Sequence, residues 1–137
     1  MFFNETDFKF DKAEAWQDWV EAAVNEEGFE TDKINYIFCS DDYLLQINIQ
    51  YLQHDYYTDV IGFQYSEGRK LSGDIYISID RVSENAIENA VSFEKELARV
   101  MIHGILHFMN YKDKNEEDIK AMRNAENKYL AFFNEIN

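Results

Sequence analysis

A long apolar helix is predicted over Phe93–Met109, and this segment most constrains the fold of the chain. Large apolar side chains recur along it at the spacing of one helix face: Ile102, Ile105, Leu106 and Met109. No apolar run in the chain approaches the roughly 18 residues that a membrane span needs. The other elements therefore have to supply the surface that buries this stripe.

Strands and helices are mixed along the rest of the chain. Strands are predicted at Met1–Phe10, Ile34–Cys39, Thr58–Tyr65 and Asp74–Ile79. Further helices are predicted at Lys12–Glu27, from a Ser40–Asp41 cap to Leu52, at Ser83–Ala90, and from an Asn115 cap to Phe133. Glycines between the third and fourth strands favour a hairpin. The order predicts one domain over residues 1–137 with an α+β fold, in which mixed-sheet α/β layers of about four strands surround a central helix.

The composition fits a packed protein in a reducing compartment. Hydrophobic residues make up 46% of the 137 residues, which is enough apolar surface for one core. The segment Met1–Phe10 carries early acids and lacks the basic start of a secretory signal. The lone Cys39 follows two apolar residues, which indicates a buried, inert thiol rather than a nucleophile. We therefore expect a cytoplasmic protein without membrane association.

The net charge of −14 argues against generic binding of nucleic acid through a basic surface. The charge is uneven, because residues 1–33 hold ten acids and three bases while residues 111–137 hold six acids and five bases. The C-terminal segment is thus the least repulsive surface for a polyanion. Elsewhere, and above all in residues 1–33, the acids act mainly to keep the protein soluble.

Two histidines on the apolar helix form the most informative motif. His103 and His107 are spaced i, i+4, so both imidazoles lie on one face and can reach one ion. Asn110 follows at the helix end, where asparagine tolerates the left-handed conformation that reverses the chain. That reversal would bring Asp113 towards the two rings. Two imidazoles and one carboxylate would leave a position for water, whose pKa a bound metal lowers.

The same residues also have a plain structural interpretation. A pair of histidines four apart on an apolar helix is often a hydrogen-bonded structural pair, and Asp113 lies in a Lys-Asp-Lys sequence typical of a solvated loop. Two of the three histidines in the chain fall in the motif, which favours the metal site without deciding the matter.

An ordered set of segments resembles the YbeY endoribonuclease family. The run His103-Gly104-Ile105-Leu106-His107-Phe108-Met109-Asn110-Tyr111 is similar to the family signature His-Gly-x-Leu-His-Leu-x-Gly-Tyr-Asp-His. Upstream, Thr58–Phe63 is similar to the family's Thr-Asp-Val-Leu-Ser-Phe strand and Gly73–Ser78 to its Gly-Asp-Ile strand, with Asn48 and Tyr51 on the helix before them. The resemblance runs from about Ile34 to the C-terminal helix.

The resemblance implies a single-strand endoribonuclease that acts in ribosomal RNA maturation and ribosome quality control. It also implies that His103 and His107 are metal ligands, and that Asp113 stands where the family has its third zinc-binding histidine. A carboxylate is a competent zinc ligand. A His₂-carboxylate set also suits Fe(II) or Mn(II), and Ni is a further alternative to Zn.

The chain departs from the family at a position thought to help with RNA. Leu52 stands where many members carry an arginine. We predict that Lys112, Lys114 and His54 contact the substrate, although spacing alone does not select them over Arg69 or Lys70. Neither the general acid nor the oligomeric state follows from the sequence.

Two alternative functions remain open at this stage. A metallopeptidase would place glutamate directly after the first histidine as general base, but Gly104 occupies that position. A non-catalytic adaptor that binds metal and docks on a ribosomal protein or GTPase would fit the acidity and the missing arginine.

Other acidic and aromatic residues that could have a functional role are interpreted as structural. Asp59 and Asp74 at strand ends suit hydrogen bonding better than ligation. The following aromatic residues are expected in the core rather than as platforms for bases: Trp16, Trp19, Phe63, Phe132 and Phe133.

Overall fold

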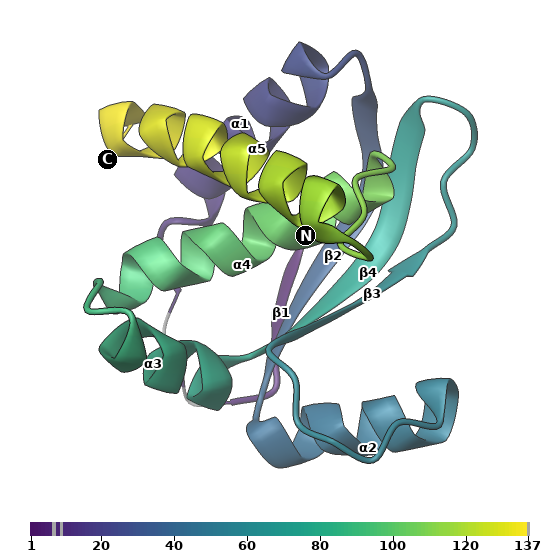
Figure 1. Cartoon of the computed structure of the whole chain (residues 1–137), viewed down its shortest axis with the longest axis vertical. Coiled ribbons are helices and arrows are strands. Elements are labelled where there is room, and N and C mark those ends of the chain that lie inside the picture. Colours follow the sequence, from purple (N-terminus) through teal and green to yellow (C-terminus); the bar gives the residue numbers. More distant parts are fainter. Residues whose placement is uncertain (7, 9, 137) are drawn as a thin grey trace.

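A computed structural model describes residues 1–6, 8 and 10–136, and side chains up to Phe133 (Figure 1). Its strands are β1 (Phe2–Asn4), β2 (Glu30–Cys39), β3 (Val60–Gln64) and β4 (Lys70–Ser78). Its helices are α1 (Ala13–Glu26), α2 (Asp41–Leu52), α3 (Ile79–Glu88), α4 (Phe93–Phe108) and α5 (Glu116–Ile136). The strands form one mixed sheet of order β1-β2-β4-β3, in which only the β3–β4 pair is antiparallel. The predicted α+β fold and hairpin are confirmed.

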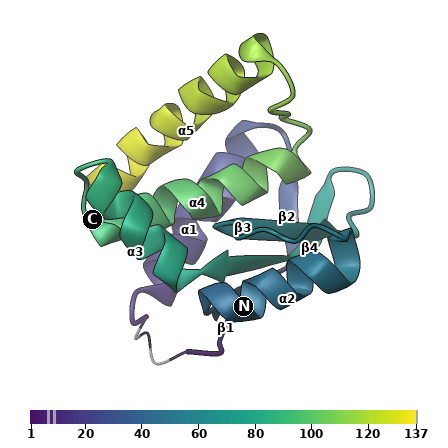
Figure 2. The same ribbon diagram turned by 60° about the horizontal axis from the view of Figure 1, so that its bottom comes forward.

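The helices form layers on both faces of the sheet. Helix α2 covers one face, whereas α1 and α4 pack on the other (Figures 1 and 2). Helix α5 lies across the outer side of α4, and α3 packs beside α4. The predicted central helix is therefore confirmed, because α4 is enclosed by the sheet, α3 and α5.

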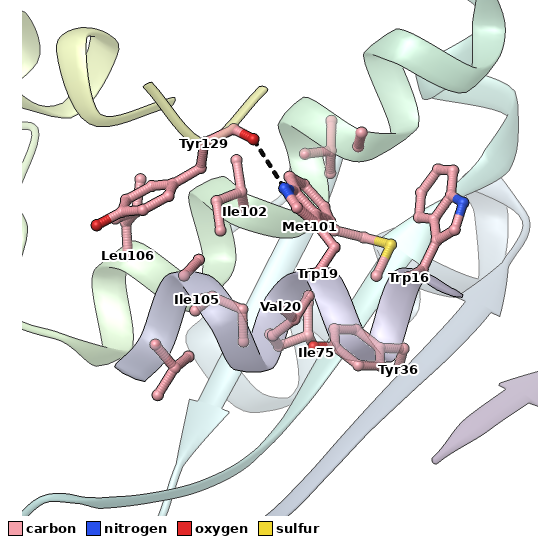
Figure 3. Packing of buried hydrophobic residues seen from close by; sticks show 14 of the residues in the cluster. Trp16, Trp19, Val20, Tyr36, Ile75, Met101, Ile102, Ile105, Leu106 and Tyr129 are labelled. Carbon is pink, nitrogen blue, oxygen red and sulfur yellow. Dashed lines mark hydrogen bonds between the residues drawn. The ribbon is translucent and has the colours of Figure 1, made fainter. Parts of the chain in front are cut away.

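Alternation along the strands divides the apolar side chains between two cores. Phe38 of β2 and Ile75 of β4 point to the large core under α1 and α4, while their neighbours Cys39 and Tyr76 contact the smaller core under α2. The two predicted core tryptophans are buried, and the indole of Trp19 donates a 2.7 Å hydrogen bond to the carbonyl oxygen of Tyr129 (Figure 3). This contact ties α1 to α5 through the centre of the large core.

The element boundaries follow their caps. Ser40, Ser78 and Ser92 accept hydrogen bonds from backbone N–H groups in the first turns of α2, α3 and α4. Helix α3 consequently begins at Ile79, four residues earlier than predicted. Asn115 caps α5 as predicted, by accepting from the Asp118 N–H at 2.8 Å.

The first predicted strand is shorter than expected. Only Phe2–Asn4 pairs with β2, and residues 7 and 9 of the predicted Met1–Phe10 strand lie outside the described residues. In the part of the chain that the structure describes, no helix is both long and apolar enough to cross a lipid bilayer.

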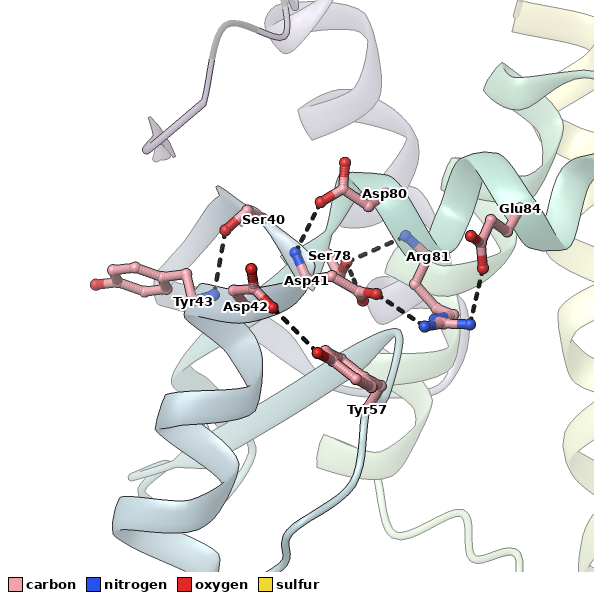
Figure 4. Close-up of polar contacts among 9 residues, drawn as sticks. All are labelled: Ser40, Asp41, Asp42, Tyr43, Tyr57, Ser78, Asp80, Arg81 and Glu84. Atoms are coloured by element: carbon pink, nitrogen blue, oxygen red, sulfur yellow. Dashed lines mark hydrogen bonds and ion pairs between the residues drawn. The ribbon is translucent and has the colours of Figure 1, made fainter.

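The start of α2, the start of α3 and the loop after α2 share a polar network (Figure 4). The guanidinium of Arg81 donates to Asp41 at 2.8 Å and to Glu84 at 2.9 Å. The Tyr57 hydroxyl donates to Asp42 at 3.1 Å, and Arg81 lies over the Tyr57 ring. The network fastens the loop between α2 and β3 to the rest of the fold.

Cys39 is fully buried, as predicted, and its thiol donates to the carbonyl oxygen of Ile77. Burial, reinforced by nearby carboxylates, raises the pKa of the thiol to about 12. A thiol with so high a pKa is protonated at neutral pH and therefore a poor nucleophile.

Two glycines let α4 lie against the sheet. A Cβ atom on Gly104 of α4 would come within 3.2–3.3 Å of the Ile75 side chain. A Cβ atom on Gly73 of β4 would lie 2.5 Å from the Phe108 ring and 2.7 Å from the carbonyl oxygen of Phe63. The C-terminal turn of α4, which carries His107, is therefore seated where the sheet has no side chain in its way.

We predict that Gly73→Ala destabilises the fold by about 1–3 kcal/mol, because the added methyl group overpacks a buried contact. Urea unfolding would measure the loss. In this background Phe108→Leu should cost less than in the wild-type chain, since the smaller side chain partly relieves the clash. An unchanged unfolding midpoint for Gly73→Ala would contradict the close approach.

Candidate metal-binding site

The two predicted histidines lie together near the C-terminal end of α4. Their spacing by one helical turn places the two Nε2 atoms 3.1 Å apart, with the rings almost perpendicular. Both side chains are partly exposed, at the border between the buried face of the helix and an open pocket. This position suits groups that must be held firmly and still reach a ligand.

The chain reverses immediately after α4. Asn110 adopts a left-handed conformation with φ of 74°, as predicted. The N–H groups of Asn110 and Tyr111 donate to the carbonyl oxygens of His107 and Leu106, which is the Schellman pattern of helix ends. The reversal brings Oδ2 of Asp113 to 3.4 Å from Nε2 of His107 and 3.9 Å from Nε2 of His103.

The three donor atoms fit one small cation. Tetrahedral zinc, with bonds of about 2.0–2.1 Å, places its ligand atoms about 3.3 Å from one another. The three separations here run from 3.1 to 3.9 Å, and His103, His107 and Asp113 form the one group of this kind among the described residues. The donor set is thus compatible with a divalent transition metal.

A buried carboxylate is hydrogen-bonded to Nδ1 of His103, the ring nitrogen that faces away from the site. Glu126 of α5, only 4% exposed, has Oε2 2.8 Å from Nδ1 of His103, while its Oε1 accepts a 2.8 Å hydrogen bond from Arg99. Burial acts to raise the pKa of Glu126, but the hydrogen bonds from His103 and Arg99 outweigh it and the pKa is lowered. An ionised Glu126 accepts a hydrogen bond from Nδ1–H, which leaves the lone pair of Nε2 directed at the site.

A second carboxylate holds the segment that carries Asp113. Glu27, at the end of α1, accepts a 2.8 Å hydrogen bond from the hydroxyl of Tyr111 and another from the hydroxyl of Tyr129. Tyr111 directly follows the left-handed Asn110. The bend is therefore anchored to α1 and α5 two residues before Asp113.

The three donors open into a pocket of about 630 Å³ between α4, β3 and the loop after α2. Its other walls combine apolar residues, Leu52 among them, with the following polar ones: Asn48, His54, Tyr56, Thr58, Asp59 and Gln64. The side-chain amide of Gln64 donates to the carbonyl oxygen of Phe108, which ties β3 to the end of α4.

The predicted substrate residues fall in different places. His54 lines the pocket, whereas Lys112 lines a separate depression with Met109 and Asp118. Lys114 is exposed on the loop that follows Asp113. Among the described residues that line the main pocket, none is lysine or arginine.

Two residues of the site escaped the sequence analysis. Glu126 falls on the buried stripe of α5 formed by Met122, Ala125 and Tyr129, and an acid on such a stripe was the available signal. Asp59 was interpreted as a strand-end residue that makes hydrogen bonds, and its carboxylate does bond backbone N–H groups at the start of β3; the pocket position was not predicted. Burial raises the pKa of its carboxyl group.

The comparisons with known proteins agree along nearly the whole chain. A family model described as "Endoribonuclease YbeY" matches residues 2–134. Proteins named Endoribonuclease YbeY from Flavobacterium johnsoniae and Flavobacterium psychrophilum are 48% and 51% identical over 132 residues, covering 96% of this chain and 95% and 94% of their own length. The solution structure of a Thermotoga maritima protein is similar with a TM-score of 0.66 and 33% identity, over 95% of this chain and 87% of that one.

We predict that Tyr111→Phe loosens the bend at Asp113, because Glu27 loses one of its two hydroxyl donors. Stability should fall by about 1 kcal/mol, and amide hydrogen exchange should rise in residues 109–115. Tyr57→Phe is the matched control, since it removes a tyrosine hydrogen bond to a carboxylate far from the bend. Equal exchange of residues 109–115 in Tyr111→Phe and wild type would refute the anchoring role.

Proposed function

Because the chain belongs to the YbeY endoribonuclease family, we propose that it cleaves single-stranded RNA in the pocket above His103, His107 and Asp113, with a divalent metal ion held by these three side chains. The observation that carries the proposal is the convergence of two imidazoles and one carboxylate at the edge of an open pocket. Within this proposal, residues 1–137 act as one YbeY-like domain.

The chain's own groups have distinct roles in this hypothesis. A bound ion supplies Lewis acidity, which acidifies water and draws electron density from a phosphodiester. Glu126 fixes the tautomer and orientation of His103, and Arg99 keeps Glu126 ionised. Asp59, with its raised pKa, is the pocket carboxyl group best suited to hold or release a proton during strand scission.

We propose zinc as the ion. The donor separations and the pairing of two nitrogens with one oxygen match a catalytic zinc site, in which a fourth position stays open. The same His₂-carboxylate set accepts Fe(II), Mn(II) or Ni(II), so metal analysis of freshly purified protein has to identify the ion.

We propose ribosomal RNA as the substrate, cut during its maturation and in ribosome quality control in the cytoplasm. Lys112 and Lys114 flank Asp113 in the sequence, and in this proposal they hold phosphates that run past the site rather than inside the pocket. A ribosomal protein or a GTPase would be the partner that brings so acidic a chain to RNA.

The peptidase alternative conflicts with the packing of α4. The position of the zincin general base is held by Gly104, which has no carboxylate, and a Cβ atom there would press on Ile75 of the sheet. The non-catalytic adaptor remains a competing hypothesis, favoured by the pocket's lack of lysine and arginine, and cleavage assays separate it from the enzyme.

We predict that His107→Ala abolishes both stoichiometric metal binding and cleavage of a single-stranded RNA. Metal content by elemental analysis and product formation on denaturing gels would be measured in parallel. Lys120→Ala, an exposed change on α5, is the control and should keep both properties. Metal-loaded wild-type protein that leaves RNA intact would favour the adaptor, and stoichiometric metal in His107→Ala would exclude the proposed ligands.

We predict that Glu126→Gln weakens metal binding about 10- to 100-fold, because the amide no longer fixes the tautomer of His103 by accepting its proton as a carboxylate. Competition with a chromophoric chelator measures the dissociation constant without any activity assay. Glu117→Gln, on the exposed first turn of the same helix, should leave that constant unchanged. Equal affinity in both variants would show that Glu126 serves stability alone.

A further inference from the structure

The charge of the pocket poses a problem for a protein that binds RNA. Asp59 and Asp113 line it, no lysine or arginine is among its described lining residues, and the whole chain carries a net charge of −14. Phosphate neutralisation by basic side chains is the usual source of affinity for nucleic acid. Inside this pocket no basic side chain supplies that affinity, so apart from the proposed metal ion it has to come from uncharged contacts.

Two aromatic rings on the pocket wall offer such a contact. His54 and Tyr56 are stacked on each other, with ring centroids 5.1 Å apart and an interplanar angle of 20°. The Tyr56 hydroxyl and Nδ1 of His54 share a 2.9 Å hydrogen bond, which holds the two rings as one unit. Tyr56 is 55% exposed, so a large part of the stacked pair faces solvent within the pocket.

The loop that carries these rings is held in place rather than free. The side-chain amide of Asn48, a residue 1% exposed, donates to the carbonyl oxygen of Tyr56 at 2.9 Å, and the backbone carbonyl oxygen of Asn48 accepts from the N–H of His54 at 3.1 Å. On the far side of the loop, Tyr57 is tied to Asp42 and lies under Arg81 (Figure 4). A preorganised ring pair loses little conformational entropy when a ligand stacks on it.

We propose that the His54–Tyr56 pair is a stacking platform for one base of single-stranded RNA, and that it positions the strand beside the metal-binding site. This inference rests on the proposed function, since it assigns the substrate contact of the same pocket. Stacking on aromatic rings is how proteins commonly hold unpaired bases, and every base has a face that can stack. The platform supplies affinity where basic side chains are missing.

The test measures the affinity of a fluorescently labelled ten-nucleotide RNA by anisotropy at 4 °C, with the strand shown to be intact on a gel afterwards. Tyr56→Ala should raise the dissociation constant about tenfold, and Tyr56→Phe should raise it less, because it keeps the ring and loses only the hydrogen bond to His54. Tyr43→Ala is the matched control, because Tyr43 is 41% exposed, lies on α2 and does not line the pocket.

An abasic strand and a salt titration identify the contact. The effect of Tyr56→Ala should vanish on an RNA backbone of the same length without bases. The slope of affinity against salt concentration should be the same in Tyr56→Ala and wild type, because stacking releases no counterions. An effect that persists on the abasic strand, or a changed salt slope, would overturn the platform in favour of a backbone contact.

Failure of this inference can be told apart from failure of the proposed function. Wild-type cleavage with equal RNA affinity in Tyr56→Ala would overturn the platform and keep the nuclease. Binding that depends on Tyr56 without any cleavage would support the platform on an adaptor. If the wild-type protein binds no single-stranded RNA, both proposals fall.

Discussion

Helix α4 is enclosed by the sheet, α3 and α5, yet it carries two imidazoles that have to stay accessible, and the rest of the structure resolves that conflict. Glycines at the helix–sheet contact let the apolar face approach closely. On the polar face, Glu126 bonds the inner nitrogen of His103 where water is scarce, and Arg99 in turn donates to Glu126. The outer nitrogens of both histidines are left facing the pocket. One helix thus serves as the core of the fold and as the base of the site.

Much of this arrangement could be predicted because its causes are local. Helical spacing paired the two histidines, a left-handed asparagine indicated the bend towards Asp113, and capping side chains fixed most helix starts. Glu126 was not predicted, since its contact with His103 joins two helices 23 positions apart and arises only when α5 docks. Packing between helices gives only a weak signal in the sequence, which here is a single acidic residue on an apolar stripe.

The arrangement of the loop after α2 could not be predicted from the sequence either. The sequence offered His54 as a substrate contact but gave no reason to place it against Tyr56, because two residues alternating along an irregular loop have no fixed relation. Asn48 creates that relation, because its buried side-chain amide donates to the Tyr56 carbonyl oxygen and its backbone carbonyl oxygen accepts from the His54 N–H. A polar residue buried at a helix end can thus organise a neighbouring surface, in addition to any chemistry of its own.

Because the site is acidic, the proposed metal ion would also affect how strongly the site binds RNA. Asp59 and Asp113 share the main pocket with the two histidines, while Arg99 and Arg123 line an adjoining pocket with Glu126. The two carboxylates of the main pocket therefore disfavour phosphate when no ion is bound. A divalent ion would offset much of that negative charge, which couples RNA binding to metal binding by simple electrostatics. A third histidine in place of Asp113 would make the ion a stronger Lewis acid and the bare site less repulsive. With Asp113 as a ligand, the ion would be a weaker Lewis acid. The added negative charge would also make substrate binding depend more strongly on the presence of the ion.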